Sequence, residues 1–202
     1  MIRVMIVSTL AAGALFAPVA RRVADDRAGF VTTLGRDTIA MESFMRSASR
    51  FEGDIVLRVP GTVHFHYVLK VENDGTVSRS VLDLEPLGLP EMAPRRVTLD
   101  FIRDSVLVTF DSAGESHRIM RAAGNGAVPL LSTGFGASLG IYTSFGMYEL
   151  LLSRLPIHAN DTAKVVEVGA LSGRVTTRHF LSPLDDAGRG RLLQDRLDAR
   201  HA

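Results

Sequence analysis

The chain has 202 residues, which is enough for one domain of ordinary size. Hydrophobic residues make up 46% and charged residues 22%, so the composition predicts a packed core and not a disordered chain. The 23 Lys and Arg against 22 Asp and Glu leave a net charge of +1, which argues against a nucleic-acid-binding protein. The lack of cysteine excludes disulfides, thiolate metal sites, a cysteine nucleophile and a lipid anchor on cysteine.

Residues 1–20 have the pattern of a secretory signal peptide. Arg3 precedes an uncharged apolar run from Val4 to Val19, small residues end the run, and Arg21 follows. The run is shorter than the roughly 20 residues that a membrane-spanning helix needs. We therefore expect a signal peptide over residues 1–20, a linker over 21–29, and a mature chain that is periplasmic or secreted.

The clearest structural signal is alternation with a period of two. From Val63 to Val71, apolar side chains that include Phe65 and Leu69 alternate with polar ones, so this stretch predicts a strand with one buried face. Asn73-Asp74-Gly75 follows, and these residues tolerate the positive φ that tight hairpin turns require. A partner strand is predicted from Thr76 to Glu85, with a bulge near Val81-Leu82 where the alternation changes phase.

Further strands are predicted on both sides of this hairpin. Residues 37–46 favour a strand, although a short helix is an alternative there, and three prolines and a glycine predict a loop over 86–94. The other predicted strands cover residues 55–59, 97–101, 106–110, 117–121 and 165–181, the last with a turn at Ser172-Gly173. Short strands joined by tight turns predict a mainly β (α+β) fold, a curved antiparallel meander or half-barrel. We expect a single domain over 30–182 and a charged tail over 183–202.

The segment from Ala122 to Tyr148 has no charged residue. Within it a long apolar helix is predicted over 137–155, which ends before Pro156. Abundant Gly, Ser and Thr, together with Pro129, argue against a membrane span, so we expect none in the mature chain. Because a sheet with one apolar face must cover it, we expect this helix to lie across the concave face. It would then contact residues such as Phe65, Leu69, Leu99 and Phe101.

One motif suggests a hydrolase. Gly136-Ala137-Ser138-Leu139-Gly140 matches the G-x-S-x-G pattern that exposes a nucleophilic serine on a strained turn. Asp161 and His179 follow in the right order for a triad. The motif is preceded by predicted antiparallel hairpins and not by alternating strands and helices, so close helix packing explains its glycines better. A serine hydrolase that uses Ser138, Asp161 and His179 is therefore the alternative.

A second motif suggests a metal. His64 and His66 lie two residues apart on a predicted strand, so both imidazoles face the same way and could reach one metal ion. The pair resembles the paired strand histidines of carbonic anhydrases and cupins. No third ligand is evident from the spacing, and two solvated histidines on a polar face are the favoured interpretation. We expect no cofactor, no metal and no enzymatic activity.

The export signal, the curved antiparallel sheet and the apolar helix lie in an order that resembles bacterial periplasmic lipoprotein-carrier-like half-barrels, over residues 30–181. The layout is also similar to other secreted bacterial β-rich proteins. The resemblance implies an exported, non-enzymatic binding domain for an apolar small molecule, a lipid or an envelope protein; a structural envelope protein is a further alternative. The candidate ligand-binding residues are those expected on the concave face: Phe65, Leu69, Phe101, Ile141, Phe145 and Tyr148.

Overall fold

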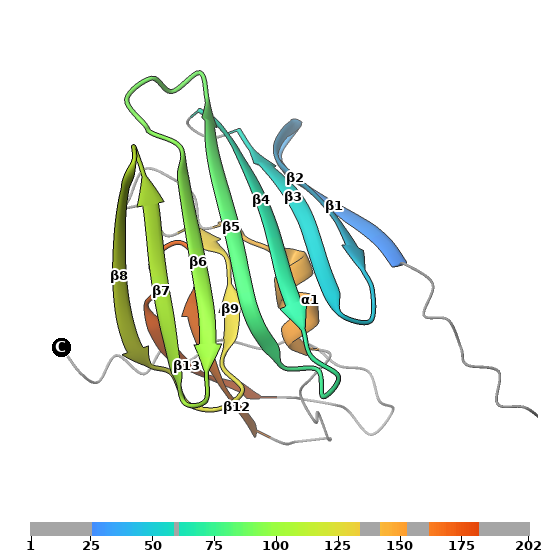
Figure 1. Cartoon of the computed structure of the whole chain (residues 1–202). Helices are drawn as coiled ribbons and strands as arrows, with labels where there is room; N and C mark the ends of the chain where they lie inside the picture. The colour runs from blue at the N-terminus through green and yellow to red at the C-terminus, as the bar shows by residue number, and fades with distance from the viewer. Residues whose placement is uncertain (1–25, 59–60, 134–141, 153–161, 182–202) are drawn as a thin grey trace, which may run out of the picture.

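A computed structural model describes residues 26–58, 61–133, 142–152 and 162–181 (Figure 1). The predicted signal peptide and charged tail lie outside these residues. Eight strands form one antiparallel sheet in which each strand pairs with the next along the chain. They are β1 (Asp26–Leu34), β2 (Asp37–Arg46), β3 (Arg50–Leu57), β4 (Thr62–Val71), β5 (Val77–Leu87), β6 (Arg95–Ile102), β7 (Ser105–Ser112) and β8 (Glu115–Ala122). The sheet is the predicted antiparallel meander, and it is open, with β1 and β8 at its edges.

Two strands extend into ranges that were expected to have no strand. β1 begins at Asp26, inside the range expected to be a linker. β5 continues through Pro86 to Leu87, where a loop was expected. β6 pairs with β5 only as far as Leu84, so Pro86 lies where β5 has a neighbour on one side alone. A proline, which cannot donate a backbone hydrogen bond, is tolerated at such a position.

The register of the β4–β5 hairpin is the predicted one. Phe65 pairs with Leu84 and Tyr67 with Leu82, and all four side chains are buried. The turn contains Gly75 with a φ of 83°, a conformation that glycine adopts without strain. His64 and His66 therefore point to the outer face of the sheet, as expected from the alternation.

The prediction of a bulge near Val81-Leu82 is wrong. Both residues pair regularly, and the register shifts instead between Lys70 and Val71, next to the turn. Val81 lies opposite Val68, the one apolar residue on the polar side of β4. The alternation in the sequence is interrupted there because Val68 and Val81, two apolar residues that face outward, pack against each other across the two strands.

A second layer covers the concave face (Figure 1). β9 (Val128–Leu130), β12 (Thr162–Gly169) and β13 (Val175–Leu181) form a three-stranded sheet in which β9 runs parallel to β12. β10 (Ser132–Thr133) pairs with β11 (Tyr142–Thr143), which leads into α1 (Phe145–Leu152). The buried side chains form two clusters. One joins β2–β5 to α1, β9 and Val165, and the other joins β6 and β7 to Val168 and the chain around β9.

The prediction of a helix over 137–155 is wrong in its length, and the expectation that this helix alone covers the concave face is also wrong. Within the described residues α1 has eight residues, and Tyr142–Thr143 form a strand. Met147 and Leu151 of α1 are buried with Phe65 and Leu69, whereas Leu99 lies in the other cluster with Val168 of β12. α1 therefore covers the part of the concave face around Phe65 and Leu69, and the small sheet covers the part around Leu99. No helix in the described ranges has the length and apolar character needed to cross a membrane.

Candidate functional site

The predicted ligand-binding residues differ in how far their side chains are exposed. Phe65 and Leu69 are 1% and 0% exposed, because the second layer packs on them. Phe101 is partly buried between the two clusters. Ile141 lies outside the described residues. The concave face under the second layer is therefore protein core. Tyr148 is partly buried against that core, so among the described residues of the predicted set only Phe145 is exposed.

Phe145 at the start of α1 is 43% exposed, and it belongs to a row of aromatic rings. Its ring lies 5.2 Å from that of Phe30 on β1, which is itself 38% exposed. From Phe30 the row continues inward through Phe44 and Phe51 to the buried Tyr67, with neighbouring centroids 5.2–5.9 Å apart. Offset and tilted ring pairs at these distances attract each other. We call the exposed end of this row, Phe30 and Phe145, the aromatic rim.

Phe30 is not among the predicted ligand-binding residues, and Phe145 is among them only because of its place on the predicted helix. Alternation in β1 and β2 places Phe30 and Phe44 on the inner face, since Ala28 pairs with Phe44 and Phe30 with Glu42. Recognising Phe30 from the sequence would have required a predicted strand over Asp26–Leu34, and no strand was predicted there.

Glu42 fixes the position of the rim. Its side chain is buried, and its carboxylate accepts hydrogen bonds from the backbone N–H groups of Phe145 (2.8 Å) and Gly146 (3.2 Å). The Ser144 and Tyr67 hydroxyls donate to the same carboxylate at 2.6 and 3.0 Å. Glu42 thus satisfies N–H groups that the first turn of a helix leaves without intrahelical partners.

A serine cap and a glycine also determine the position of α1. Ser144 caps the helix, since its Oγ also accepts from the N–H of Met147 at 3.1 Å. A Cβ on Gly146 would lie 2.8 Å from both the Tyr67 hydroxyl oxygen and a ring carbon of Phe44, so only glycine allows the helix to approach this closely. Phe145 is therefore held beside Phe30 by a fixed network.

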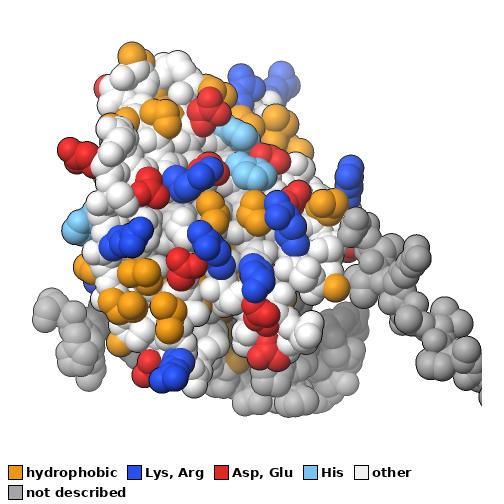
Figure 2. All heavy atoms as spheres, viewed as in Figure 1, with side chains coloured by type: hydrophobic (Ala, Val, Ile, Leu, Met, Phe, Trp, Pro, Cys, Tyr) orange, Lys and Arg blue, Asp and Glu red, His pale blue; other side chains and the backbone are white. Residues whose placement is uncertain are grey.

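The outer face of the large sheet is polar. Figure 2 views this face, where side chains of both charges are interspersed and two histidine side chains lie side by side. Asp54 Oδ1 lies 2.9 Å from His64 Nε2 and 3.0 Å from His66 Nδ1, so the predicted pair shares one carboxylate. No group of three or more His, Cys, Asp or Glu side chains among the described residues is arranged to hold a metal ion.

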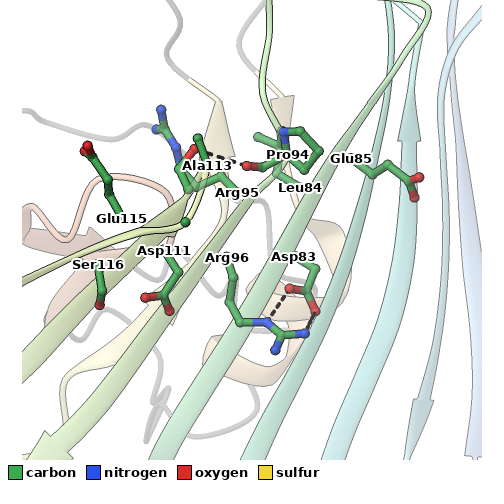
Figure 3. Close-up of a pocket in the computed structure, with 12 residues that line it drawn as sticks. Asp83, Leu84, Glu85, Pro94, Arg95, Arg96, Asp111, Ala113, Glu115 and Ser116 are labelled. Atoms are coloured by element: carbon green, nitrogen blue, oxygen red, sulfur yellow. Dashed lines mark hydrogen bonds and ion pairs between the residues drawn. The ribbon is translucent and has the colours of Figure 1, made fainter.

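A hollow of about 610 Å³ lies at one end of β5–β8 (Figure 3). Arg96 on its floor donates two hydrogen bonds to Asp83, at 2.5 and 3.0 Å. These bonds to the Asp83 carboxylate raise the pKa of the Arg96 guanidinium above its ordinary value. Glu115 and Asp111 add further carboxylates to the lining of this hollow.

Of the three residues of the alternative hydrolase triad, the structure describes His179 alone. His179 lies on β13, opposite Lys164 of β12. Ser138 and Asp161 lie outside the described residues.

A scan against protein-family models gives no match, and a search of curated proteins also gives none. Among solved structures, the chain is similar to a crystal structure of a DUF1089 family protein from Pseudomonas aeruginosa, with 14% sequence identity and a TM-score of 0.46. The similarity covers 82% of this chain and 91% of that chain. The comparisons show no lipoprotein-carrier-like family, so that resemblance rests on the layout of the antiparallel sheet alone.

Proposed function

We propose that the protein is an exported, non-enzymatic binding domain that takes an apolar ligand, or an apolar segment of an envelope partner, at the aromatic rim. The observation that carries the proposal is the exposure of Phe30 and Phe145. These rings contact each other, yet each keeps about two fifths of its surface in water, at 38% and 43%. Covering such a surface is worth about 25 cal/mol per Å² of apolar area removed from water.

The apolar surface is concentrated at this edge of the molecule. Of the eight large apolar side chains that are exposed in the described residues, five lie on β1, on β2 or at the start of α1. They are Phe30, Val31, Leu34, Met41 and Phe145. Among them Phe30 and Phe145 contact each other, and contiguous apolar exposure is typical of interaction sites, whereas single exposed apolar residues are ordinary.

The network around Glu42 supports binding at a preformed site. The N–H of Phe145 is itself one of the donors to the carboxylate, so the backbone at the rim is fixed before a ligand arrives. A fixed site loses less conformational entropy on binding than a mobile one. Tyr148 lies one turn after Phe145 on α1, and its partly buried side chain packs against the core beside the rim.

The export part of the proposal rests on residues 1–20, whose basic start, apolar middle and small end are typical of a cleaved signal. A structural envelope role is the second candidate. It is favoured by the second layer, which uses Phe65 and Leu69 for internal packing.

The experiment measures binding of the apolar fluorophore N-phenyl-1-naphthylamine, with oleate as the competitor. We expect fluorescence enhancement with the wild-type protein, displacement by oleate, and loss of both in Phe30→Ser and Phe145→Ser. Ile102→Ser is the matched control, because Ile102 is as exposed as the rim residues and lies on β6, away from β1 and α1. Circular dichroism checks that each variant is folded. Equal binding by Phe145→Ser and wild type would contradict the proposed site.

A further inference from the structure

Three charged side chains lie beside the aromatic rim, and we call Asp26, Arg46 and Glu149 the ion triad. Arg46 of β2 reaches both carboxylates through one nitrogen, since its Nη2 lies 3.3 Å from Asp26 Oδ2 on β1 and 3.0 Å from Glu149 Oε1 on α1. Its Cζ lies over the Phe44 ring, 5.4 Å from the centroid, and that ring stacks on Phe30 of the rim. The ion triad therefore joins β1 and α1, the two elements that carry the rim.

The ion triad and the rim share the same faces of these two elements. Residues four apart on a helix are neighbours, so Glu149 lies one turn beyond Phe145 on α1. Side chains of a strand alternate between its faces, and β1 pairs regularly with β2 from Asp26 to Phe30, so both of these side chains point inward. The rise from rim to ion triad is about 6 Å along α1 and about 13 Å along β1. One amphiphilic molecule is long enough to cover the rim and reach the ion triad.

The ion triad presents negative charge to water. One guanidinium balances only one of the two carboxylates. The side chains of Asp26 and Glu149 are 66% and 42% exposed, whereas that of Arg46 is 29% exposed. Because Phe44 covers the guanidinium and both carboxylates engage it, an anionic group would have to displace a carboxylate to reach Arg46. A cationic group meets two exposed carboxylates and displaces neither.

We propose that the ligand of the aromatic rim is a cationic amphiphile, an apolar chain that ends in an ammonium group, and that Asp26 and Glu149 bind this head. The inference rests on the proposed function, since it names the class of ligand that the same site takes. Ion pairs at exposed carboxylates contribute little to affinity. The apolar chain on Phe30 and Phe145 therefore supplies most of the affinity, and the ion triad supplies the selectivity for the head.

Displacement of N-phenyl-1-naphthylamine by three amphiphiles with the same chain tests the head. Dodecylammonium, dodecanol and dodecanoate are compared below the concentrations at which they form micelles. We expect dodecylammonium to displace the fluorophore at a concentration about two- to fivefold below that of dodecanol, the effect typical of one exposed ion pair, and dodecanoate to need more than dodecanol. Added salt should reduce the differences, because it screens exposed charges.

Two neutral variants on different elements locate the effect. Glu149→Gln and Asp26→Asn each cancel the net charge and keep an oxygen that can accept from Arg46. Each should remove the preference for dodecylammonium and leave the affinity for dodecanol unchanged. Glu85→Gln is the matched control, because it removes an exposed carboxylate from the outer face of β5, and it should keep the preference. Circular dichroism checks that every variant is folded.

The outcomes distinguish this inference from the proposed function. Equal displacement by the three amphiphiles, or a preference that survives in both Glu149→Gln and Asp26→Asn, would overturn the cationic head and leave the rim as an apolar site. Tighter binding of dodecanoate than of dodecanol would also overturn it, because the head would then bind Arg46. Failure of all three to displace the fluorophore would contradict the proposed site itself, and this inference with it.

Discussion

Removal of the Glu42 carboxylate tests the network that positions α1. Glu42→Ala takes away the acceptor for the N–H groups of Phe145 and Gly146 and for the hydroxyls of Ser144 and Tyr67. The hydroxyls can rotate toward other acceptors, but the two backbone donors keep their direction. A buried donor left without a partner costs about 1–3 kcal/mol, so the two donors, of which the Phe145 N–H is only partly buried, predict a loss of roughly 2–6 kcal/mol.

Urea unfolding followed by far-UV circular dichroism measures this loss as a fall in the midpoint at unchanged slope. In a domain of this size, the same loss corresponds to a fall in Tm of roughly 4–24 °C. Glu85→Ala is the control, since Glu85 is an exposed carboxylate on the outer face, and its change should stay within about 0.5 kcal/mol. A stability change of less than about 1 kcal/mol in Glu42→Ala would refute the reasoning, because orphaned donors cannot cost so little.

A double-mutant cycle separates the network from general packing. Tyr67→Phe removes one donor to Glu42 and should cost about 0.5–3 kcal/mol in the wild-type background, since that bond is to a charged acceptor. In the Glu42→Ala background the same change should cost much less, because the bond is already lost. Equal costs in the two backgrounds would show that the Tyr67 hydroxyl does not act through Glu42.

Further changes probe the core, the outer face and the N-terminus. Gly53→Ala should destabilise the domain by about 1–3 kcal/mol in urea unfolding, because the added Cβ would lie 2.5 Å from both a backbone oxygen and the Tyr67 hydroxyl. Leu151→Ala, at a side chain that is 1% exposed, should cost about 2–5 kcal/mol by the same measurement. Elemental analysis should find no stoichiometric zinc; one bound zinc that is lost in His64→Ala would contradict this. Intact-mass measurement after expression in a bacterial host should show loss of about 20 N-terminal residues, and a product that keeps them would refute export by cleavage.

The sequence alone determined the large sheet from β2 to β8, because the signal for an antiparallel meander is local, whereas β1 was not predicted. Alternation along 63–71 and the Asn-Asp-Gly turn after it set which side chains of β4 face inward. Phe65 and Tyr67 are buried, and His64 and His66 lie on the outer face, as predicted. Each strand pairs with its neighbour in the chain, so no distant contact was needed to infer the order of the strands.

Only the tertiary structure decided the second layer. β9 pairs in parallel with β12, so Val128 lies beside Glu167, and no local pattern predicts a pairing between such distant residues. The position at which α1 begins also depends on a residue distant in the sequence. The charge-free segment allowed a long helix, but Glu42 of β2 binds the N–H groups of Phe145 and Gly146, more than a hundred residues later in the chain. The aromatic rim forms because that distant carboxylate places Phe145 against Phe30. This contact depends on the tertiary structure, and no residue spacing in the sequence predicts it.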